Sequence, residues 1–293
     1  MKLNGINKRG VKIFAYLFLS ITIILFLFPI IWMALTSFKF QRDIMTDRII
    51  FIPDTVTVKN YREIFSKKLQ LGGDEETVFS RKGHGLRGLK NSLIITTSAT
   101  FLSLVIGLPA AYALARFGVK KKDALANWIL STRMFPPAAT VLPIFLLWQK
   151  LRLIDTYVSM IFSYLVFSLP FVIWIMRGFF HDIPQEIEES AFIDGCGLLG
   201  GFWKISIPLA TPGIAATAVF CYIFSWNEFL FGLILTRIHT QTYPVQLAGY
   251  IGTSGILWGQ MSAMAVLALT PVVILLIFTQ RYMVRGLSFG SIR

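Results

Sequence analysis

Residues 177–208 read RGFFHDIPQEIEESAFIDGCGLLGGFWKISIP, and this segment separates two long apolar stretches of the chain. It holds five acidic residues and two basic ones. Asp182 and Pro184 are helix-start signals, and the acids after them lie where the helix dipole favours negative charge. Gly195 is expected to end this helix, and a second short helix is expected over residues 198–205, before the chain turns at Pro208. The segment therefore predicts a short acidic helix between two apolar elements.

The neighbouring stretches belong to a set of six apolar runs, each long enough to cross a membrane as a helix of ~20 residues. The runs are residues 13–38, 91–115, 124–149, 156–176, 213–236 and 261–279. Within them, only Arg133 and Glu228 are charged. The first run exceeds the ~7–15 apolar residues of a signal peptide, so we expect it to be a retained span. The sequence predicts an all-α polytopic membrane protein with six transmembrane helices in a single domain, residues 1–293.

Prolines lie inside two of these runs and predict interruptions of the helices. They are Pro136, Pro137 and Pro143 in the third run and Pro170 in the fourth. A proline inside a helix removes a backbone hydrogen bond and clashes with the preceding turn. We expect helix breaks at these positions, where the backbone lines a cavity or is paired by neighbouring elements.

The composition excludes several classes of protein. The chain has 293 residues, of which 55% are hydrophobic and 15% charged, with a mean hydropathy of +0.66, which argues against a soluble enzyme. Its net charge of +13 is divided among segments separated by apolar runs, so it does not form a nucleic-acid-binding patch. Two cysteines and three scattered histidines predict no disulfide scaffold or metal site. No Walker A sequence occurs, and the G-x-G-x-x-G at 195–200 follows a helix instead of a strand. We therefore expect no cofactor on this chain.

The distribution of Lys and Arg over the short loops predicts that both termini face the cytoplasm. The N-terminal tail carries four basic residues, the loop 116–123 another four and the C-terminal tail three, against three in the short loops of the opposite side. The long loop 39–90 is then periplasmic, although it holds eleven basic and seven acidic residues. Its insert at residues 67–85 has no assigned role. Its charge could steer an acidic oligosaccharide or an acidic binding protein, but ordinary solvated charge is the more common explanation.

The acidic loop 177–208 then lies in the cytoplasm, where a negative balance runs against the positive-inside tendency. Two interpretations stay open from composition alone. One is a solvated turn between two spans. The other is a docking element for a cytoplasmic partner.

Several segments, in one order along nearly the whole chain, resemble the permease subunits of bacterial ABC importers. Within the acidic loop, the positions that resemble the EAA motif are Glu189, Ser190, Ala191, Asp194, Gly195, Ile205 and Pro208. The other matching segments are PDTVTVKNYREIF at 53–65, Asn91-Ser92-Leu93, AAYALARF at 110–117, WNEFL at 226–230 and QRYMVRGLSFGSI at 280–292. Together they resemble the carbohydrate importers, the group that includes the maltose system's G subunit. Ser190, Cys196 and Ile207 depart from the family pattern by small changes.

This resemblance implies the type I ABC importer fold, with a coupling helix in the cytoplasmic loop. Its implied coupling residues are Glu186, Glu188, Glu189, Ser190, Ala191, Asp194, Gly195, Ile205 and Pro208. The expected partners are a second permease subunit, expected to be a different chain, two ATPase subunits that bind ATP and Mg, and an extracytoplasmic solute-binding protein. Glu188, Glu189 and Asp194 would pair with basic residues of the ATPase, and Ser190 and Ala191 would allow its close approach. The chain would be a non-catalytic subunit of the bacterial inner membrane that imports an oligosaccharide, with neutral and acidic sugars both open.

Trp226, Asn227 and Glu228 combine an aromatic face with hydrogen-bonding groups, which is typical of sugar sites. They are candidate substrate-pathway residues, although bonding of Asn227 and Glu228 to neighbouring helices or backbone is the more common role of such groups. A second hypothesis is an ion-coupled secondary transporter that uses Glu228 and Arg133 as buried charges. Against it, Arg133 is close enough to the end of its run to reach the membrane surface.

Overall fold

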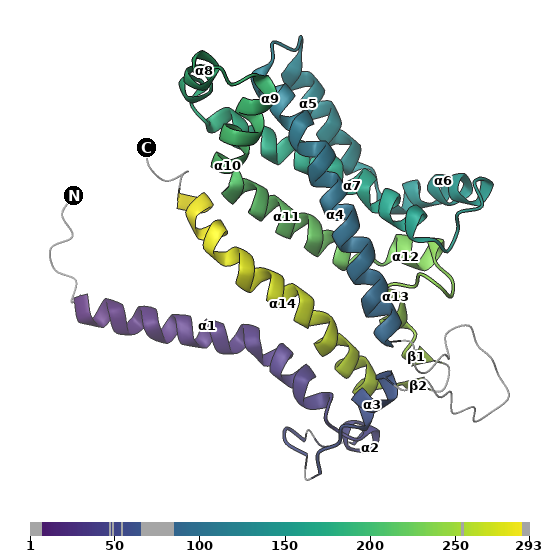
Figure 1. Cartoon of the computed structure of the whole chain (residues 1–293). Coiled ribbons are helices and arrows are strands. Elements are labelled where there is room, and N and C mark those ends of the chain that lie inside the picture. Colours follow the sequence, from purple (N-terminus) through teal and green to yellow (C-terminus); the bar gives the residue numbers. More distant parts are fainter. Residues whose placement is uncertain are drawn as a thin grey trace. The chain divides into compact units, whose positions relative to one another are not determined.

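The structure, a computed structural model, describes residues 8–46, 48, 50–53, 55–65, 85–252 and 255–288. The chain divides into two compact units, residues 1–84 with 249–268 and residues 85–248 with 269–293 (Figure 1). The insert expected at residues 67–85 lies outside the described residues, apart from Gly85.

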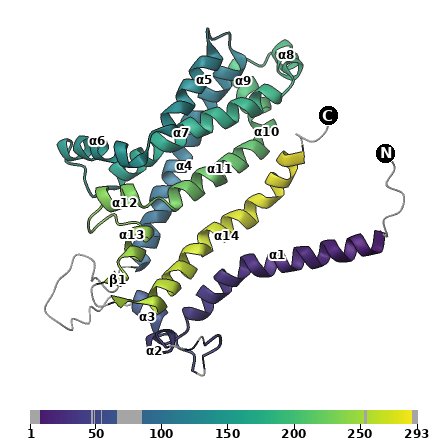
Figure 2. The same ribbon diagram turned by 180° about the vertical axis from the view of Figure 1, so that it is seen from behind.

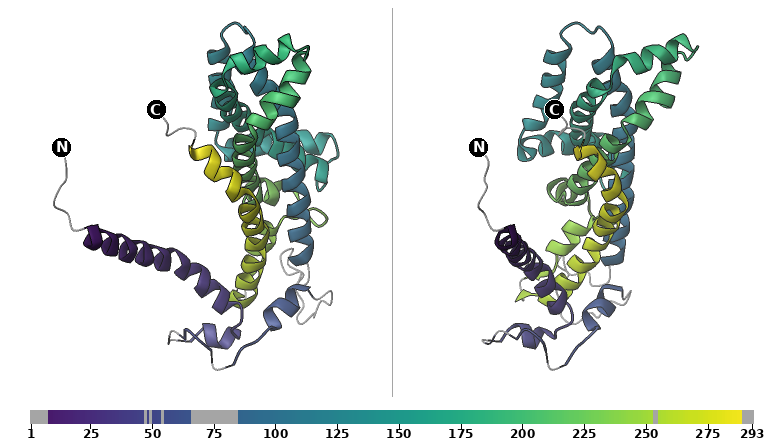
Figure 3. Two further views of the ribbon diagram at one scale, coloured as in Figure 1. Left: turned by 60° about the vertical axis from the view of Figure 1, so that its left-hand side comes forward. Right: turned by 90° about the vertical axis from the view of Figure 1, so that its left-hand side faces the viewer.

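The first unit contains the helix α1 (Lys8–Thr36), drawn in purple in both views of Figure 3. It is followed by α2 (Gln41–Ile44) and α3 (Lys59–Phe65), and by a hairpin of β1 (Ile251–Gly252) and β2 (Gly255–Ile256) that leads into α14 (Trp258–Ser288). In α14, the division between the two units falls after Ala268. Large apolar side chains are exposed along α1, as expected of a helix that lipid or another subunit covers.

Asn60 orders the chain that leaves α1. Its side-chain amide donates to the carbonyls of Ser37 and Lys39, at 2.8 and 2.9 Å. Gly259 of α14 lies directly against this amide, because a Cβ at that position would be 2.6 Å from Asn60 Nδ2. Burial lowers the pKa of Lys39, whose ammonium lies 4.2 Å from the Trp32 ring centroid. The segment 53–65, which includes Asn60, thus fixes the end of the first apolar helix by hydrogen bonds.

The second unit is built on two long helices, α4 (Gly85–Arg116) and α7 (Tyr157–Asp182), with α11 (Thr211–Trp226) packed against both. Figures 1 and 2 show these three helices side by side. Small residues let α4 and α7 approach closely, since a Cβ on Gly107 would lie 2.5 Å from a methyl of Val172. Close contact through small residues is the usual way in which helices associate in a membrane.

The remaining elements of this unit are shorter. They are α5 (Lys122–Ser131), the 3-10 turn η1 (Thr132–Met134), α6 (Pro137–Lys150), α8 (Gln185–Ile193), α9 (Leu198–Gly201), the π-helical η2 (Phe202–Ser206), α10 (Ile207–Leu209), α12 (Leu230–Leu235) and α13 (Tyr243–Ala248).

Four described helices are long and apolar enough to cross a membrane, and two bent helix pairs could make up to six spans. The four are Val11–Thr36, Gly85–Arg116, Tyr157–Asp182 and Trp258–Gln280. The bent pairs are Lys122–Met134 with Pro137–Lys150, at 88°, and Leu198–Leu209 with Thr211–Trp226, at 74°.

The third and fifth apolar runs differ from a single helix. The third, 124–149, is divided at Pro136 and Pro137, which confirms the break expected there (Figure 2). The fifth, 213–236, is divided between α11 and α12 by residues 227–229. The breaks expected at Pro143 and Pro170 are wrong, because both prolines lie inside continuous helices. A lone proline can be kept in a membrane helix when neighbouring elements pair the freed backbone groups.

Asp155, in the turn between α6 and α7, ties that turn to the segment after α12. Its carboxylate accepts the backbone N–H groups of residues 237–240, at 3.0–3.2 Å, and the Thr240 hydroxyl at 2.8 Å. Partial burial opposes ionisation, but the four backbone donors outweigh it and lower the pKa of Asp155 to about 2. Nearby, the Asn91 amide donates to the carbonyls of His239 and Gln241, both at 2.9 Å. One carboxylate and one amide therefore hold this segment in place.

We predict that Asp155→Asn lowers the thermal stability of the purified protein in detergent, because the charge that the four N–H groups bind is lost. Asparagine tolerates the positive φ of 61° at this position, so the variant tests the charge and not the backbone. The pKa of Asp155 is lowered from 3.8 to about 2 in the folded protein. The ionised carboxylate therefore contributes its full stabilisation above pH 3.8, and this stabilisation is lost as the pH falls through 2. The gap in melting temperature between wild type and variant is expected to be constant from pH 5 to 8. A gap that changes over that range would contradict this assignment.

Candidate functional site

The acidic helix expected in residues 177–208 is present as α8. Pro184 occupies its N-cap position, and Glu186 and Glu188 lie in its first turn. The helix ends at Ile193, and Gly195 then takes a φ of +86°, a conformation that glycine adopts without steric cost. The Gly195 N–H donates to the Phe192 carbonyl at 3.1 Å. The start at Pro184 and the glycine stop are therefore confirmed, whereas Asp182 is the last residue of α7 and not a start signal of α8.

Glu188 points inward and joins three elements of the fold. Its carboxylate accepts Nε and Nη2 of Arg116 from α4, at 3.0 and 2.9 Å. It also accepts the Tyr112 hydroxyl at 3.0 Å and the Ser206 hydroxyl at 2.7 Å. The side chains of Arg116 and Glu188 are 7% and 5% exposed. A buried carboxylate with four donors is well satisfied, so this network attaches α8 to α4 and η2.

This arrangement corrects the expected role of Glu188. The pairing expected with a basic residue of a partner is instead made with Arg116 of the same chain. Arg116 has a further bond, from Nη2 to the Ile183 carbonyl at 2.8 Å, next to the start of α8. Ala191, which we expected to lie at a contact with the partner, is 6% exposed and also faces the chain.

The other predicted coupling residues are turned outward or lie beside the π-helical turn. Glu186, Glu189, Ser190, Asp194, Gly195 and Pro208 are exposed, and Ile205 is half-buried. The same segment exposes three large apolar side chains that the sequence reasoning had not singled out, Ile193, Leu199 and Trp203, which are 87%, 72% and 61% exposed. For Ile193, a large apolar residue at the end of a short acidic helix is the signal that could have identified it.

The helical stretch after Gly197 continues through Gly200 and Gly201 and widens into the π-helix η2. Gly201 is required there, because a Cβ would lie 2.8 Å from the Phe192 ring. The π-helical turn carries Ser206 to Glu188 and Phe202 to the Tyr112 ring, whose centroid is 4.9 Å away. π-Helical turns are frequent at functional sites.

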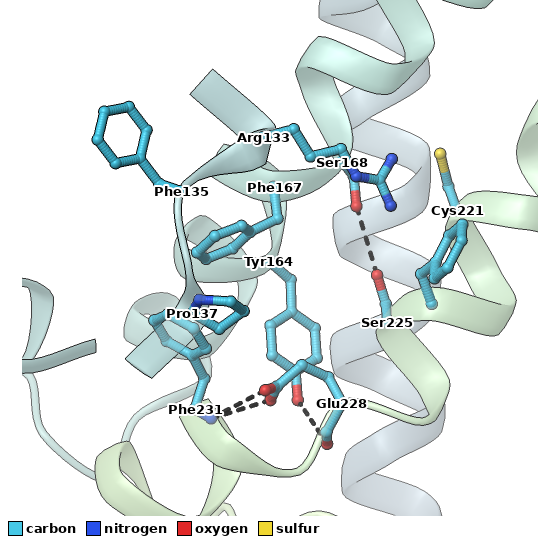
Figure 4. Close-up of a pocket in the computed structure, with 11 residues that line it drawn as sticks. Arg133, Phe135, Pro137, Tyr164, Phe167, Ser168, Cys221, Ser225, Glu228 and Phe231 are labelled. Carbon is cyan, nitrogen blue, oxygen red and sulfur yellow. Dashed lines mark hydrogen bonds between the residues drawn. The ribbon is translucent and has the colours of Figure 1, made fainter. Parts of the chain in front are cut away.

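A second candidate site is a cavity of about 210 Å³ where the helix break between η1 and α6 meets α7 and α11. Figure 4 shows eleven residues that line it. They are Arg133, Phe135, Pro137, Tyr164, Phe167, Ser168, Cys221, Phe224, Ser225, Glu228 and Phe231. Five of these are aromatic, and two charged groups of opposite sign face the same space.

Of the three predicted pathway residues, only Glu228 lines this cavity. Trp226 is 2% exposed and stacks between Tyr222 and Tyr243, at centroid distances of 5.7 and 4.8 Å. Asn227 donates to the Ile223 carbonyl at 2.9 Å and accepts the Tyr243 hydroxyl at 3.1 Å. The Trp226 indole is therefore a packing group. The Asn227 amide bonds the backbone and a neighbouring side chain, which was the alternative to a substrate-binding role.

The Glu228 carboxylate also accepts hydrogen bonds from backbone N–H groups. Its carboxylate accepts the N–H groups of Phe231 and Gly232 at 3.0–3.2 Å, in the first turn of α12. A carboxylate satisfies the unpaired N–H groups of a helix start. The division of the fifth apolar run at residues 227–229 is thus stabilised by the one acid within that run.

Arg133 lies in η1, at the break of the third apolar run. Its guanidinium carbon is 4.5 Å from the Phe171 ring centroid and 4.6 Å from that of Phe224. Arg133 therefore lines the cavity, and its reach to the membrane surface stays a prediction. Cation–π contacts stabilise such a charge away from water.

The fold and these sites define a membrane subunit of a transport system. Residues 103–289 match the family described as binding-protein-dependent transport system inner membrane component, and the chain belongs to that family. A probable ABC transporter permease protein of Sinorhizobium fredii is 36% identical over 96% of both chains. The trehalose/maltose transport system permease protein MalG of Thermococcus litoralis is 32% identical over 92% of both chains.

A solved structure shares the fold. A bacterial ABC transporter involved in the import of the acidic polysaccharide alginate superposes with a TM-score of 0.72 and 23% identity, covering 96% of this chain and 99% of that chain. The expected type I ABC importer fold is therefore confirmed. The alternative of an ion-coupled secondary transporter is not supported, because the family and its relatives are subunits of ABC importers.

We predict that Glu188→Ala destabilises the protein by about 3–5 kcal/mol, because it leaves the Arg116 guanidinium buried without a counter-charge. Thermal unfolding of the purified protein in detergent measures this loss. Glu189→Ala, at the exposed neighbouring position, is the control and is expected to change stability little.

The double variant Glu188→Ala with Arg116→Met removes both charges, so it is expected to be less destabilised than Glu188→Ala alone. Equal losses in the Glu188 and Glu189 single variants would show that the buried network does not hold α8.

Proposed function

We propose that this chain is one of two permease subunits of an ATP-driven importer of oligosaccharides in the bacterial cytoplasmic membrane. Residues 1–293 form one permease domain that supplies half of the translocation pathway and carries out no chemistry itself. ATP and Mg are bound by two separate ATPase subunits. An extracytoplasmic solute-binding protein delivers the sugar, and the second permease subunit is a different chain.

The observation that carries this proposal is the attachment of α8. A coupling element has to present an outward face to the ATPase and to be joined firmly to the spans that it moves. The ion pair of Glu188 with Arg116, at 2.9 Å, joins α8 to the end of the long apolar helix α4. On its outward side, α8 presents Glu186, Glu189 and Asp194. Both requirements are met within one short segment.

The outward face has the composition of a docking surface. Exposed Ile193, Leu199 and Trp203 provide apolar contact area, and the exposed acids of the same segment provide charge for basic residues of a partner. Ser190 and Gly195 are small and exposed, which allows close approach. Ile205 and Pro208 then connect this surface to α11. We assign coupling to this face, and we assign the positioning of α8 to Glu188 and Ala191.

Carbohydrate is the proposed substrate class because the relative from Thermococcus litoralis is a trehalose/maltose permease. The proposed orientation follows from the basic short loops, which place both termini and residues 177–208 in the cytoplasm. In this orientation, α8 and the loop 116–123 share the cytoplasmic side, and Asp155 lies on the outer side. Of the three predicted substrate-pathway residues, we retain Glu228 as a pathway residue, because it lines the cavity.

Gly195→Asp tests the coupling role. We predict that it abolishes ATP-dependent sugar uptake while the protein still reaches the membrane, because a charged side chain would project at the point of closest approach to the ATPase. Aspartate is among the residues that tolerate positive φ, and nothing lies within 4 Å of a Cβ at Gly195, so the fold is expected to persist.

Gly118→Asp is the matched control, since Gly118 is also open to a Cβ and lies in the other short cytoplasmic loop. It is expected to transport normally. Uptake at the wild-type rate by Gly195→Asp, at equal amounts in the membrane, would contradict a coupling role for this loop.

A further inference from the structure

The Arg133 side chain has donors that the described part of the chain does not use. A guanidinium offers five N–H donors and accepts none. Within the part of the chain that the structure describes, Arg133 makes no hydrogen bond and no ion pair, whereas Arg116 and Arg177 are both ion-paired. A charged group in an apolar segment is costly and usually has a function. The unused donors face the cavity that Arg133 lines (Figure 4).

The aromatic rings around Arg133 direct it toward the cavity. Phe171 and Phe224 form a T-shaped pair, with centroids 5.8 Å apart and planes at 83°. The guanidinium lies over both rings, so this corner shields it on one side by cation–π contact. The planar fork of donors is then left for a ligand, and such a fork matches the two oxygens of a carboxylate.

Glu228 does not neutralise Arg133. Both residues line the cavity, but the Glu228 carboxylate is occupied by the N–H groups of Phe231 and Gly232. Figure 4 shows the two charged groups at separate ends of the cavity, and no ion pair joins them. The acid is thus committed to the start of α12, and Arg133 stays available for an anion.

The rest of the lining fits a sugar ring. Phe167 and Tyr164 present aromatic surface, and Ser168 and Ser225 present hydroxyl groups whose bond to each other is long, at 3.5 Å. Apolar walls with a few placed polar groups are the usual composition of small-molecule sites. A volume of about 210 Å³ is below the ~300–1,000 Å³ of most ligand pockets, so the cavity suits one unit of a longer chain.

We propose that this cavity is a subsite for one uronate unit of an acidic oligosaccharide, in which Arg133 binds the carboxylate and the aromatic residues contact the ring. The subsite rests on the proposed function, because it lies in the pathway of a carbohydrate importer. It places recognition of substrate charge on this subunit, at the helix break between η1 and α6.

The test uses the complete transporter with its partner permease, ATPases and binding protein, reconstituted in liposomes. Uptake is measured for a mixture of uronate oligosaccharides and their carboxyl-reduced, neutral counterparts, with the products identified by mass spectrometry. The wild-type transporter is expected to accumulate the uronate oligosaccharides in preference to their neutral counterparts. Arg133→Gln is expected to lose at least about tenfold in uronate uptake, the usual effect of losing hydrogen bonds to a charged group.

Arg237→Gln is the control, because Arg237 lies in an exposed loop and contributes its backbone N–H to Asp155; it is expected to transport as wild type does. If Arg133→Gln does not assemble, Arg133→Lys replaces it. Lysine keeps the charge without the fork, so the KM for uronates is expected to rise while kcat is unchanged.

Three results would overturn the subsite: ATP-dependent uptake of the neutral sugars alone, uronate uptake that Arg133→Gln leaves unchanged, or an unchanged KM in Arg133→Lys. Each of these leaves the proposed function intact. The absence of any ATP-dependent carbohydrate uptake by wild type would instead overturn the proposed function, and the subsite with it.

Discussion

The ion pair between Glu188 and Arg116 is the interaction on which the proposed mechanism depends. It is almost wholly buried, and the hydroxyls of Tyr112 and Ser206 complete the coordination of the carboxylate. A buried charge pair of this kind adds less to net stability than to specificity, because removing one partner is costly while replacing both by apolar groups often is not. Its effect here is geometrical: one bond network fixes the orientation of α8 relative to α4 and to the π-helical turn that leads into α11. In the proposed mechanism, a movement of α8 therefore acts on α4 through these bonds, and on α11 through η2 and α10.

Two of the apolar runs are each divided into two helices. In the third run, Pro136 and Pro137 end one helix and begin the next. In the fifth, Glu228 binds the N–H groups that α12 exposes at its start. Irregular backbone is tolerated at membrane depth where it lines a cavity, and the cavity of Arg133 and Glu228 lies beside both interruptions. The breaks that cost helical hydrogen bonds are thus the features that create a polar space within apolar segments.

Local signals in the sequence were sufficient to predict the membrane helices, the limits of α8 and one of the helix breaks. The length and apolarity of six runs predicted the helical membrane fold, and Pro184 and Gly195 predicted the limits of α8, because caps and turns depend on residues a few positions apart. The double proline at 136–137 was predicted as a break for the same reason. Pro143 and Pro170 carry the same local signal without breaking their helices, since pairing of the freed backbone groups depends on tertiary neighbours.

The candidate sites were predicted less well because they depend on contacts between distant segments. Glu188 and Glu189 are adjacent and identical in type, and only the position of Arg116, 72 residues earlier, decides which one is buried. The WNEFL segment combined aromatic and polar groups, yet Trp226 is taken up by stacking with Tyr222 and Tyr243. Arg133 was judged by its distance from the end of an apolar run. That criterion could not reveal the cavity, because the helix breaks directly after η1 and the guanidinium lies against Phe171 and Phe224.

The number of sugar molecules imported per ATP hydrolysed is the measurement that tests the central claim most directly. It is made on the reconstituted transporter carrying Glu188→Gln, which keeps the shape of the side chain and removes its charge. If the ion pair transmits movement from α8 to the spans, the variant assembles with its ATPases and hydrolyses ATP, but imports fewer sugars per ATP than wild type. An unchanged ratio, in a variant that assembles and hydrolyses ATP, would contradict the account.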